Sequence, residues 1–203
     1  MSPLLPKSWP GHEKRWPGKI QEGQAEDEMA HIHERGLEPS QFLVENIGLL
    51  PRGRAYDVAM GAGPNAIYLA KMGFEVEGVD ISPQAVSTAL ESARKSRVNL
   101  RAQVADLEDN FYIEKGVYDV IICFNYLQRS LIPQMKDGLR KGGMVVYETF
   151  TVEQAQFGKP ENPDYLLKPN ELLYMFRDFR CLRYREGIIE ARRAVASIIA
   201  EKV

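Results

Sequence analysis

Apolar positions along the chain fall into short runs, separated by longer stretches in which they recur at helical spacing. The short runs predict strands at residues 55–59, 74–79, 100–105, 118–124 and 144–150. The run at 118–124 is almost continuously apolar, as is typical of a strand buried on both faces of a sheet. The pattern therefore indicates a central sheet whose strands are separated by helices.

Helix signals occupy the stretches between these runs. Pro64 suits the first position of a helix, and Gly73 suits the residue that closes it. Ser82 and Pro83 mark a second helix start, after which apolar residues recur at helical spacing. The pair at 142–143, two glycines, predicts a turn before the fifth strand. Further helices are predicted at residues 39–50, 131–139 and 169–176.

Strands that alternate with helices predict an α/β fold with a doubly wound, mostly parallel sheet. Two more runs, at 180–185 and 192–200, are joined only by residues 187–190. That link is too short for a parallel crossover, so these runs are expected to pair antiparallel and to complete a sheet of seven strands. Residues 1–36 carry only one weak helix signal, at 25–35, and we interpret them as an N-terminal arm before a single domain at 37–203.

Ligands bind such sheets beyond the carboxyl ends of the strands, so the residues there form the candidate site. They are Asp57, Ala59, Gly61, Gly63, Asp80, Asp106, Asn125, Tyr126 and Glu148. The glycines allow a ligand to approach the backbone, and the N-terminus of the following helix favours an anionic group. Asp80, nineteen residues after Gly61, is placed to accept hydrogen bonds from a ribose diol.

Two classes of cofactor fit this arrangement. Residues 61–66 match the GxGxxA pattern of dinucleotide-binding proteins, so a nicotinamide-dependent reductase is one interpretation. Three features favour a different cofactor. Asp57 lies within the strand before the turn, Asp106 ends the third strand where an adenine would lie, and no separate substrate domain follows the sheet.

At these residues the chain resembles the class I S-adenosylmethionine-dependent methyltransferases, and within them the small bacterial tellurite-resistance-type group. The segments that carry the resemblance are DVAMGAGPNAIYLAKMGFEVEGVDIS (57–82), ADL (105–107), YDVIICFNYLQRSL (118–131), LRKGGMVVYETF (139–150) and FGKPENP (157–163). The resemblance implies a Rossmann-like sheet in the strand order 3-2-1-4-5-7-6. It also implies S-adenosyl-L-methionine as the cofactor. We expect the N-terminal arm to pack on the cofactor cleft.

The resemblance assigns a cofactor-binding role to a set of residues at the strand ends. They are Asp57, Ala59, Gly61, Gly63, Asp80, Ile81, Asp106, Leu107 and Asn125. The backbone of 59–63 would lie against the methionine part, Asp80 would hold the ribose hydroxyls, and Ile81 would lie against the adenine.

At the other contacts, the resemblance implies that Asp106 binds the adenine amino group, Leu107 donates its backbone, and Asn125 lies beside the sulfonium. Two positions depart from the pattern of the family. Ala59 stands where the class usually has its first glycine, and Pro64 stands where the subgroup often has an arginine. The missing arginine leaves the partner of the cofactor carboxylate open.

Methyl transfer from a sulfonium needs little acid–base chemistry, since the leaving group is already charged and in-line positioning provides much of the rate. Tyr126 is a candidate for a cation–π contact with the sulfonium. Arg129 and Glu148 are candidates for positioning or deprotonating the acceptor. Residues 151–168 form a connection longer than most in compact domains, and we interpret it as a wall of the acceptor site with Phe157 pointing inward.

Charge narrows the choice of acceptor. The chain holds 26 basic and 28 acidic residues, a net charge of −2, which provides no general attraction for nucleic acid. Residues 125–128 also lack the paired prolines that methyltransferases acting on base amines carry at this place. We therefore expect a small-molecule acceptor; the other interpretation, besides the reductase, is a cofactor-sensing module without catalysis.

The remaining composition sets the expected surroundings of the protein. No apolar run approaches the roughly 20 residues of a membrane span, and the N-terminus lacks a secretory apolar segment, so a cytoplasmic protein is expected. The three histidines, all before residue 34, and the two cysteines do not have metal-site spacing. Cys123 lies in an apolar strand and is expected to be a buried, inert thiol. The sequence leaves the oligomeric state open.

Overall fold

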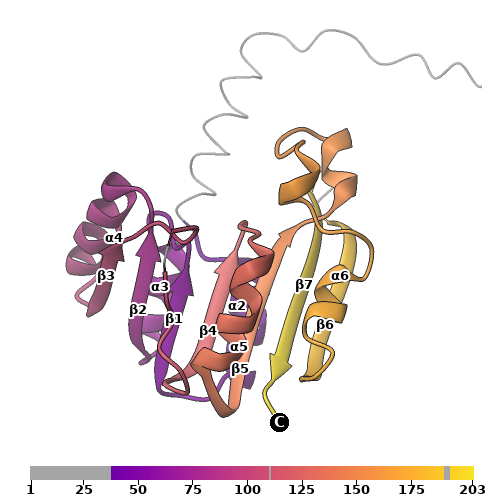
Figure 1. Ribbon diagram of the computed structural model, residues 1–203. Coiled ribbons are helices and arrows are strands. Elements are labelled where there is room, and N and C mark those ends of the chain that lie inside the picture. The colour runs from indigo at the N-terminus through magenta and orange to yellow at the C-terminus, as the bar shows by residue number, and fades with distance from the viewer. Residues whose placement is uncertain (1–37, 110, 190–192) are drawn as a thin grey trace, which may run out of the picture. The chain divides into compact units, whose positions relative to one another are not determined.

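A computed structural model describes residues 38–109, 111–189 and 193–203 (Figure 1). The predicted arm at 1–36, with its helix at 25–35, lies outside the described residues. None of the described helices is long and apolar enough to cross a membrane.

The sheet has seven strands in the order β3-β2-β1-β4-β5-β7-β6 (Figure 1). Their bounds are β1 Arg54–Val58, β2 Glu75–Asp80, β3 Leu100–Val104, β4 Tyr118–Phe124, β5 Leu139–Phe150, β6 Arg180–Ile189 and β7 Arg193–Glu201. The strands β1 to β5 pair parallel, whereas β7 pairs antiparallel with both β5 and β6. The predicted fold class, strand number and strand order are confirmed.

Helices cover both faces of this sheet, and α3 and α4 begin at the start signals of the sequence. Their bounds are α2 Gln41–Asn46, η1 Ile47–Leu49, α3 Pro64–Lys71, α4 Pro83–Lys95, η2 Arg129–Leu131, α5 Ile132–Gly138 and α6 Glu171–Met175. The side chain of Ser82 caps α4 by accepting a hydrogen bond from Ala85 N at 3.2 Å. Pro64 and Pro83 open α3 and α4, where the missing N–H costs no helical hydrogen bond.

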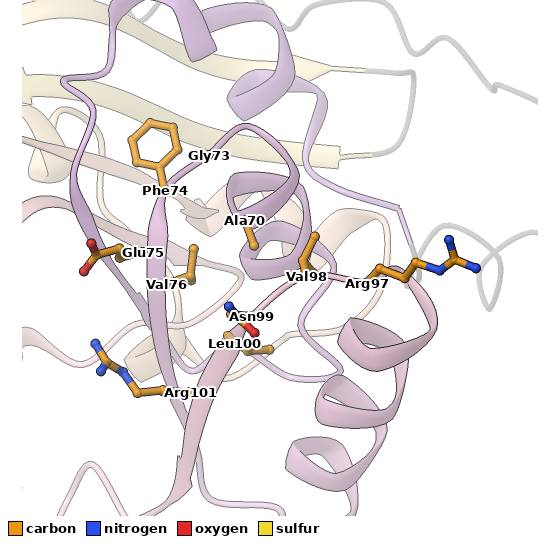
Figure 2. A pocket seen from close by; sticks show the side chains of 10 residues that line it. All are labelled: Ala70, Gly73, Phe74, Glu75, Val76, Arg97, Val98, Asn99, Leu100 and Arg101. Carbon is orange, nitrogen blue, oxygen red and sulfur yellow. The ribbon is translucent and has the colours of Figure 1, made fainter.

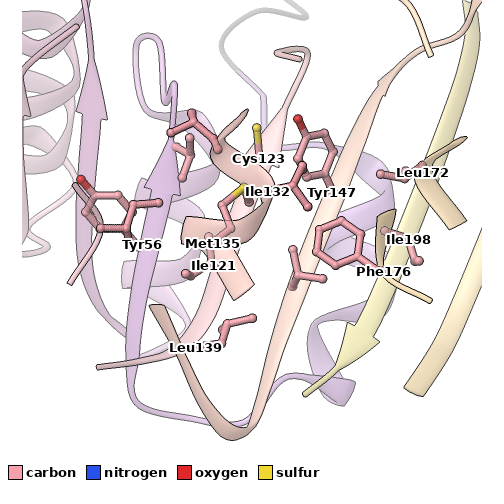
Figure 3. Close-up of a cluster of buried hydrophobic side chains, with 14 of the residues drawn as sticks. Tyr56, Ile121, Cys123, Ile132, Met135, Leu139, Tyr147, Leu172, Phe176 and Ile198 are labelled. Carbon is pink, nitrogen blue, oxygen red and sulfur yellow. The ribbon is translucent and has the colours of Figure 1, made fainter. Parts of the chain in front are cut away.

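One apolar layer lies between the sheet and the helices α5 and α6 (Figure 3). In it, Cys123 and Tyr147 from the central strands contribute to the same cluster as Met135 of α5 and Leu172 of α6. A second layer on the other face packs α2 and α3 against the same strands, with Phe42 and Leu69 at its centre. Burial on both faces explains why the run at 118–124 is almost wholly apolar: every residue of β4 is buried.

Cys123 is 1% exposed, and burial raises the pKa of its thiol above the ordinary range, whereas Cys181 is exposed on β6. Only the thiolate reacts readily with disulfide reagents. We therefore expect one thiol per folded chain to react with such a reagent at pH 8, and two thiols after denaturation. Rapid reaction of two thiols in the folded protein, or retention of the fast reaction in a Cys181→Ser variant, would contradict this packing.

Two predicted boundaries in the second half of the chain were wrong. The predicted turn at 142–143 lies inside β5, which begins at Leu139, and the parallel register with β4 shifts there between Tyr118 and Val120. Gly142 has φ of 78°, and a Cβ on Gly143 would lie 2.9 Å from a backbone oxygen. These glycines therefore make an irregularity within a strand, because glycine tolerates both the conformation and the close approach.

The predicted link at 187–190 was also wrong in part. Residues 187–189 belong to β6, with Gly187 paired to Val195 and Ile189 paired to Arg193. The branched side chains of Ile188 and Ile189 suit an extended strand, and they carry the hairpin beyond its predicted end. Residues 190–192 lie outside the described part.

Candidate functional site

The turn between β1 and α3 is built from left-handed backbone conformations. Ala59 has φ of 55°, Gly61 of 56° and Gly63 of 77°. A Cβ on Gly63 would lie 2.8 Å from the Cβ of Ala89 on α4, so glycine is required there by packing as well as by conformation. A Cβ on Gly61 would meet nothing within 4 Å, which means that this residue presents its backbone to open space. The strained conformation of Ala59 gives a physical reason for the usual glycine at its position.

Asp80, at the end of β2, holds this turn in place. Its Oδ2 accepts a hydrogen bond from Gly61 N at 2.8 Å, and its Oδ1 accepts one from Ser82 N at 2.9 Å. Each carboxylate oxygen has a second lone pair, so both remain able to accept a further hydrogen bond. The structure thus joins two of the predicted site residues, nineteen positions apart in the sequence, through one charge-assisted contact.

Asp57 lies beneath the turn and is 1% exposed. Burial raises the pKa of its carboxyl well above the ordinary value; a hydrogen bond from Ala66 N–H opposes this rise, and the charge of Asp80 adds to it. Among the described side chains, its Oδ2 is a buried oxygen without a hydrogen-bond partner. A buried oxygen in this state is suited to a donor that is not part of the described chain.

The residues that the resemblance places around an adenine follow the ends of β2 and β3, which pair in parallel and are joined there by a hydrogen bond from Ala105 N to Asp80 O at 3.1 Å. Ile81 is 63% exposed, which is unusual for an isoleucine next to a buried strand. Leu107 is buried, and its carbonyl accepts a hydrogen bond from Gln128 Nε2 at 3.1 Å. Asp106 is exposed, with Oδ1 accepting from Glu108 N at 2.8 Å.

Asn125, directly after β4, lies at the junction of two cavities. The larger, of about 720 Å³, is lined by Glu108, Asn125, Tyr126, Leu127, Phe150, Lys159, Pro160, Glu161, Asn162 and Tyr165. The smaller, of about 450 Å³, is lined by Glu38, Pro39, Ser40, Gln41, Pro64, Asn65, Phe124, Asn125, Glu148 and Arg193. Among these residues, only Asn125 belongs to both sets. The left-handed backbone of Asn125, with φ of 56°, turns the chain at this junction.

Tyr126 lines the larger cavity and is held by hydrogen bonds at its hydroxyl and at its backbone carbonyl. Its hydroxyl donates to Gln128 Oε1 at 2.6 Å, and its carbonyl accepts from the hydroxyl of Tyr147 at 2.8 Å. Burial raises the pKa of Tyr126 to about 12, and nearby acidic groups add to the rise. The phenol is therefore neutral at physiological pH, which suits it for packing and polar contact and not for removing a proton.

Arg129 holds the segment 151–168 and does not line either cavity at Asn125. Its Nε donates to Glu171 Oε1 at 2.7 Å, while Nη1 and Nη2 donate to the carbonyls of Asp164 and Leu166 at 2.7 and 3.0 Å. The hydrogen bond with Glu171 raises the pKa of Arg129 and lowers that of Glu171. These contacts use most of its N–H donors on the wall of the site, and the contact of Arg129 with an acceptor stays a prediction.

The segment 151–168 is more ordered than the sequence suggested. It contains the short helices η3 Val152–Gln156 and η4 Pro163–Tyr165, and Thr151 pairs with Leu167. It lies beyond the carboxyl end of β5, at the top of Figure 1, and residues 159–162 line the larger cavity. These lining residues support the interpretation of the segment as a wall of the acceptor site. Phe157, which was predicted to point inward, is not one of the lining residues.

Replacing Arg129 by alanine should loosen this wall. The arginine is 39% exposed, so we expect the loss to be local: amide hydrogen exchange at residues 163–167 should rise about 10-fold, corresponding to roughly 1.4 kcal/mol. Exchange measured by mass spectrometry checks this result. An Arg94→Ala variant, which removes an exposed arginine from α4, should leave the exchange of 163–167 unchanged; equal exchange in the two variants would contradict the role of Arg129.

Glu148 is 2% exposed and lies at the base of the smaller cavity. Its Oε2 accepts hydrogen bonds from Ser197 Oγ at 2.6 Å and from an Nη of Arg185 at 3.0 Å. A second arginine, Arg193, lies 3.6 Å from Oε1. Glu148, which was predicted to position or deprotonate the acceptor, is therefore surrounded by hydrogen-bond donors and cations from β6 and β7.

The sequence prediction missed Arg193, which lines the smaller cavity. Arg193 lies at the start of β7, and its Nη2 donates to Asn125 Oδ1 at 3.1 Å. The strand order offered a signal for it. An antiparallel strand beside β5 must begin where the parallel strands end, so the first residue of β7 reaches the edge that holds the site.

A further cavity of about 720 Å³ lies at the opposite edge of the sheet, where β2 and β3 begin (Figure 2). It is bordered by Phe74 and Glu75, where β2 begins, and by Asn99 and Arg101, where β3 begins. None of the predicted site residues lines it, and it is open to solvent. The carboxyl edge, with its glycine turn and acids, therefore remains the candidate site.

The chain is similar to several known proteins. Residues 55–143 match the model of a methyltransferase domain family. Hemagglutinin 1 of Eikenella corrodens is 28% identical over 142 residues, which cover 66% of this chain and 46% of that protein. A ubiquinone biosynthesis O-methyltransferase of Xanthomonas campestris pv. campestris is 26% identical over 113 residues, covering 53% and 47%. The chain thus spans about half the length of these curated relatives.

Solved structures show the same fold. TehB from Haemophilus influenzae superposes with a TM-score of 0.68 at 21% identity, covering 81% of this chain and 62% of that one. Geranyl diphosphate C-methyltransferase from Streptomyces coelicolor, crystallised with S-adenosyl-L-homocysteine, gives 0.59 at 16% identity, covering 89% and 82%. Residues 55–143 are thus similar to a methyltransferase domain, and the superpositions show that the chain shares the fold of these structures.

Proposed function

We propose that this protein is a methyltransferase that moves a methyl group from S-adenosyl-L-methionine to a small-molecule acceptor. One observation carries the proposal. The turn that Asp80 pins at Gly61 continues into Pro64 and Asn65, which line the smaller cavity together with Asn125, the residue shared by the two cavities. A cofactor that extends from Asp80 to Asn125 would bring its sulfonium to the opening of the larger cavity.

The described residues fit the cofactor chemically. Gly61 leaves room against its backbone, Asp80 has lone pairs for a ribose diol, and Ile81 offers an exposed apolar surface for an adenine. The unpartnered Oδ2 of Asp57 lies under the turn, where it would receive a hydrogen bond from a bound ligand or water. We assign the adenine amino group to Asp106, beside the buried Leu107.

When bound, S-adenosylmethionine supplies an activated methyl group on a positively charged sulfur. The chain then has to orient the acceptor in line and exclude water, since the leaving group needs no protonation. Tyr126, as a neutral phenol, and Phe150 place aromatic surface near Asn125, where it favours a cation. Arg129 contributes by holding the wall formed by residues 151–168 in place. Glu148 contributes by positioning the side chains of Arg185 and Arg193.

The size and lining of the larger cavity support a small acceptor. Its volume of about 720 Å³ is within the usual range of about 300–1,000 Å³ for small-molecule sites. Apolar and aromatic side chains line it together with a few polar groups, as is typical of such sites. The net charge of −2 gives the whole chain no attraction for nucleic acid, so a small acceptor fits the charge as well.

An acceptor screen tests this proposal. The full chain is incubated with S-adenosylmethionine and panels of thiols, phenols, amines and metalloid oxyanions, and the release of S-adenosylhomocysteine is measured. We expect at least one acceptor class to increase the release above the background rate, and an Asp80→Ala variant to lose the increase. Binding of the cofactor with no acceptor-dependent release across the panels would instead favour the cofactor-sensing interpretation.

A further inference from the structure

The smaller cavity has an excess of positive charge around its buried acid. Oε2 of Glu148 is already satisfied by Ser197 and Arg185, at 2.6 and 3.0 Å. Arg193 lies 3.6 Å from Oε1, which is beyond a normal hydrogen bond. One carboxylate thus faces two guanidinium groups, and the second of them is only partly neutralised.

Among the described residues that line this cavity, Arg193 has the one positively charged side chain. Its guanidinium lies over the ring of Phe150, 5.6 Å from the centroid, and donates to Asn125 Oδ1. Its side chain is 34% exposed, so it is within reach of a ligand. An arginine has five N–H donors, and the contact with Asn125 uses one of them. The remaining donors suit a planar, bidentate anion such as a carboxylate.

The opposite wall of the same cavity is also suited to an anion. Pro64 and Asn65 form the first turn of α3, where backbone N–H groups and the helix dipole favour negative charge. Asn65 Oδ1 is occupied, since it accepts a hydrogen bond from Ser40 N at 2.7 Å. Glu38, at the cavity edge, is exposed, so solvent screens its charge.

We propose that Arg193 binds the carboxylate of the methionine part of S-adenosylmethionine. The proposal rests on the proposed function, because it requires the cofactor to lie along the turn with its sulfonium near Asn125. The methionine carboxylate then falls in the smaller cavity, between Arg193 and the first turn of α3. A cation from the last strand of the sheet thereby takes the place of a charge that Pro64 cannot provide.

Calorimetric titration with two ligands tests this assignment. S-adenosylhomocysteine carries the carboxylate, whereas S-adenosyl-3-thiopropylamine is the same molecule without it. We expect Arg193→Gln to weaken binding of S-adenosylhomocysteine about 10- to 100-fold and to leave binding of the decarboxylated ligand within 2-fold of the unmodified chain. Arg193→Lys should restore part of the loss, because it keeps the charge but not the bidentate geometry.

Arg180→Gln is the matched control, since it removes a 63% exposed arginine at the far end of β6 and should change neither affinity. If Arg193→Gln weakens both ligands equally, or neither of them, the assignment of Arg193 is overturned while the proposed function stands. If the unmodified chain binds neither ligand, the proposed function itself fails and takes this inference with it.

Discussion

Replacing Asp80 by alanine should lower the affinity for S-adenosylhomocysteine by about 10- to 150-fold, corresponding to about 1.5–3 kcal/mol. The substitution removes the acceptor proposed for the ribose diol. It also removes the contacts of 2.8 and 2.9 Å that hold Gly61 N and Ser82 N. Both effects act in the same direction, because a turn that is no longer pinned must be ordered when the ligand binds. Isothermal titration calorimetry gives the affinity directly.

Glu75 provides the control for this variant. It lies at the first residue of β2, the same strand that ends at Asp80, and its side chain is exposed. Glu75→Ala should therefore bind S-adenosylhomocysteine as the unmodified chain does. An affinity of Asp80→Ala within 2-fold of that of Glu75→Ala would remove Asp80 from the site.

Replacing Glu148 by glutamine should lower the free energy of unfolding by about 3 kcal/mol. Breaking a buried ion pair by removing one partner typically costs 3–5 kcal/mol, because the other charge is left uncompensated. Here the side chains of Arg185 and Arg193 are 35% and 34% exposed, so water can still solvate their charges after the substitution. The lower end of the range is therefore expected. Urea denaturation followed by circular dichroism measures the change.

A surface pair supplies the comparison for Glu148. Glu91 and Lys95 form an ion pair on α4 with side chains that are 61% and 74% exposed. Such pairs contribute little, so Glu91→Gln should change the free energy of unfolding by less than about 0.5 kcal/mol. A Glu148→Gln variant as stable as Glu91→Gln would contradict the role of Glu148 as the centre of the charge network between β5, β6 and β7.

The succession of strands and helices was predictable because most strands are apolar or alternating segments and because α3 and α4 have their own start signals. Pro64, Ser82 and Pro83 lie where α3 and α4 begin. One of the wrong boundaries came from glycines. Two adjacent glycines usually indicate a turn. Here the glycines at 142–143 lie inside β5, whose course depends on its pairing with β4, and the local sequence does not indicate that pairing.

The site was predictable where it depends on local backbone and less so where it depends on contacts between distant segments. Gly61 and Asp80 lie at strand ends, and the structure joins them. The partners of Arg129 are 35 to 42 residues away, and Asn125 and Arg193 are 68 residues apart. Nothing in the sequence near Arg129 marks it as the residue that holds the wall.

The central claim is that the carboxyl edge of the sheet, which carries Asp80 and Asn125, binds S-adenosylmethionine and not a nicotinamide dinucleotide, which the turn at 61–66 also fits. Parallel calorimetric titrations of the full chain with S-adenosylhomocysteine and with NAD test it most directly. The account predicts saturable binding of S-adenosylhomocysteine at micromolar concentration and no measurable heat from NAD over the same range. Micromolar binding of NAD, without binding of S-adenosylhomocysteine, would contradict it.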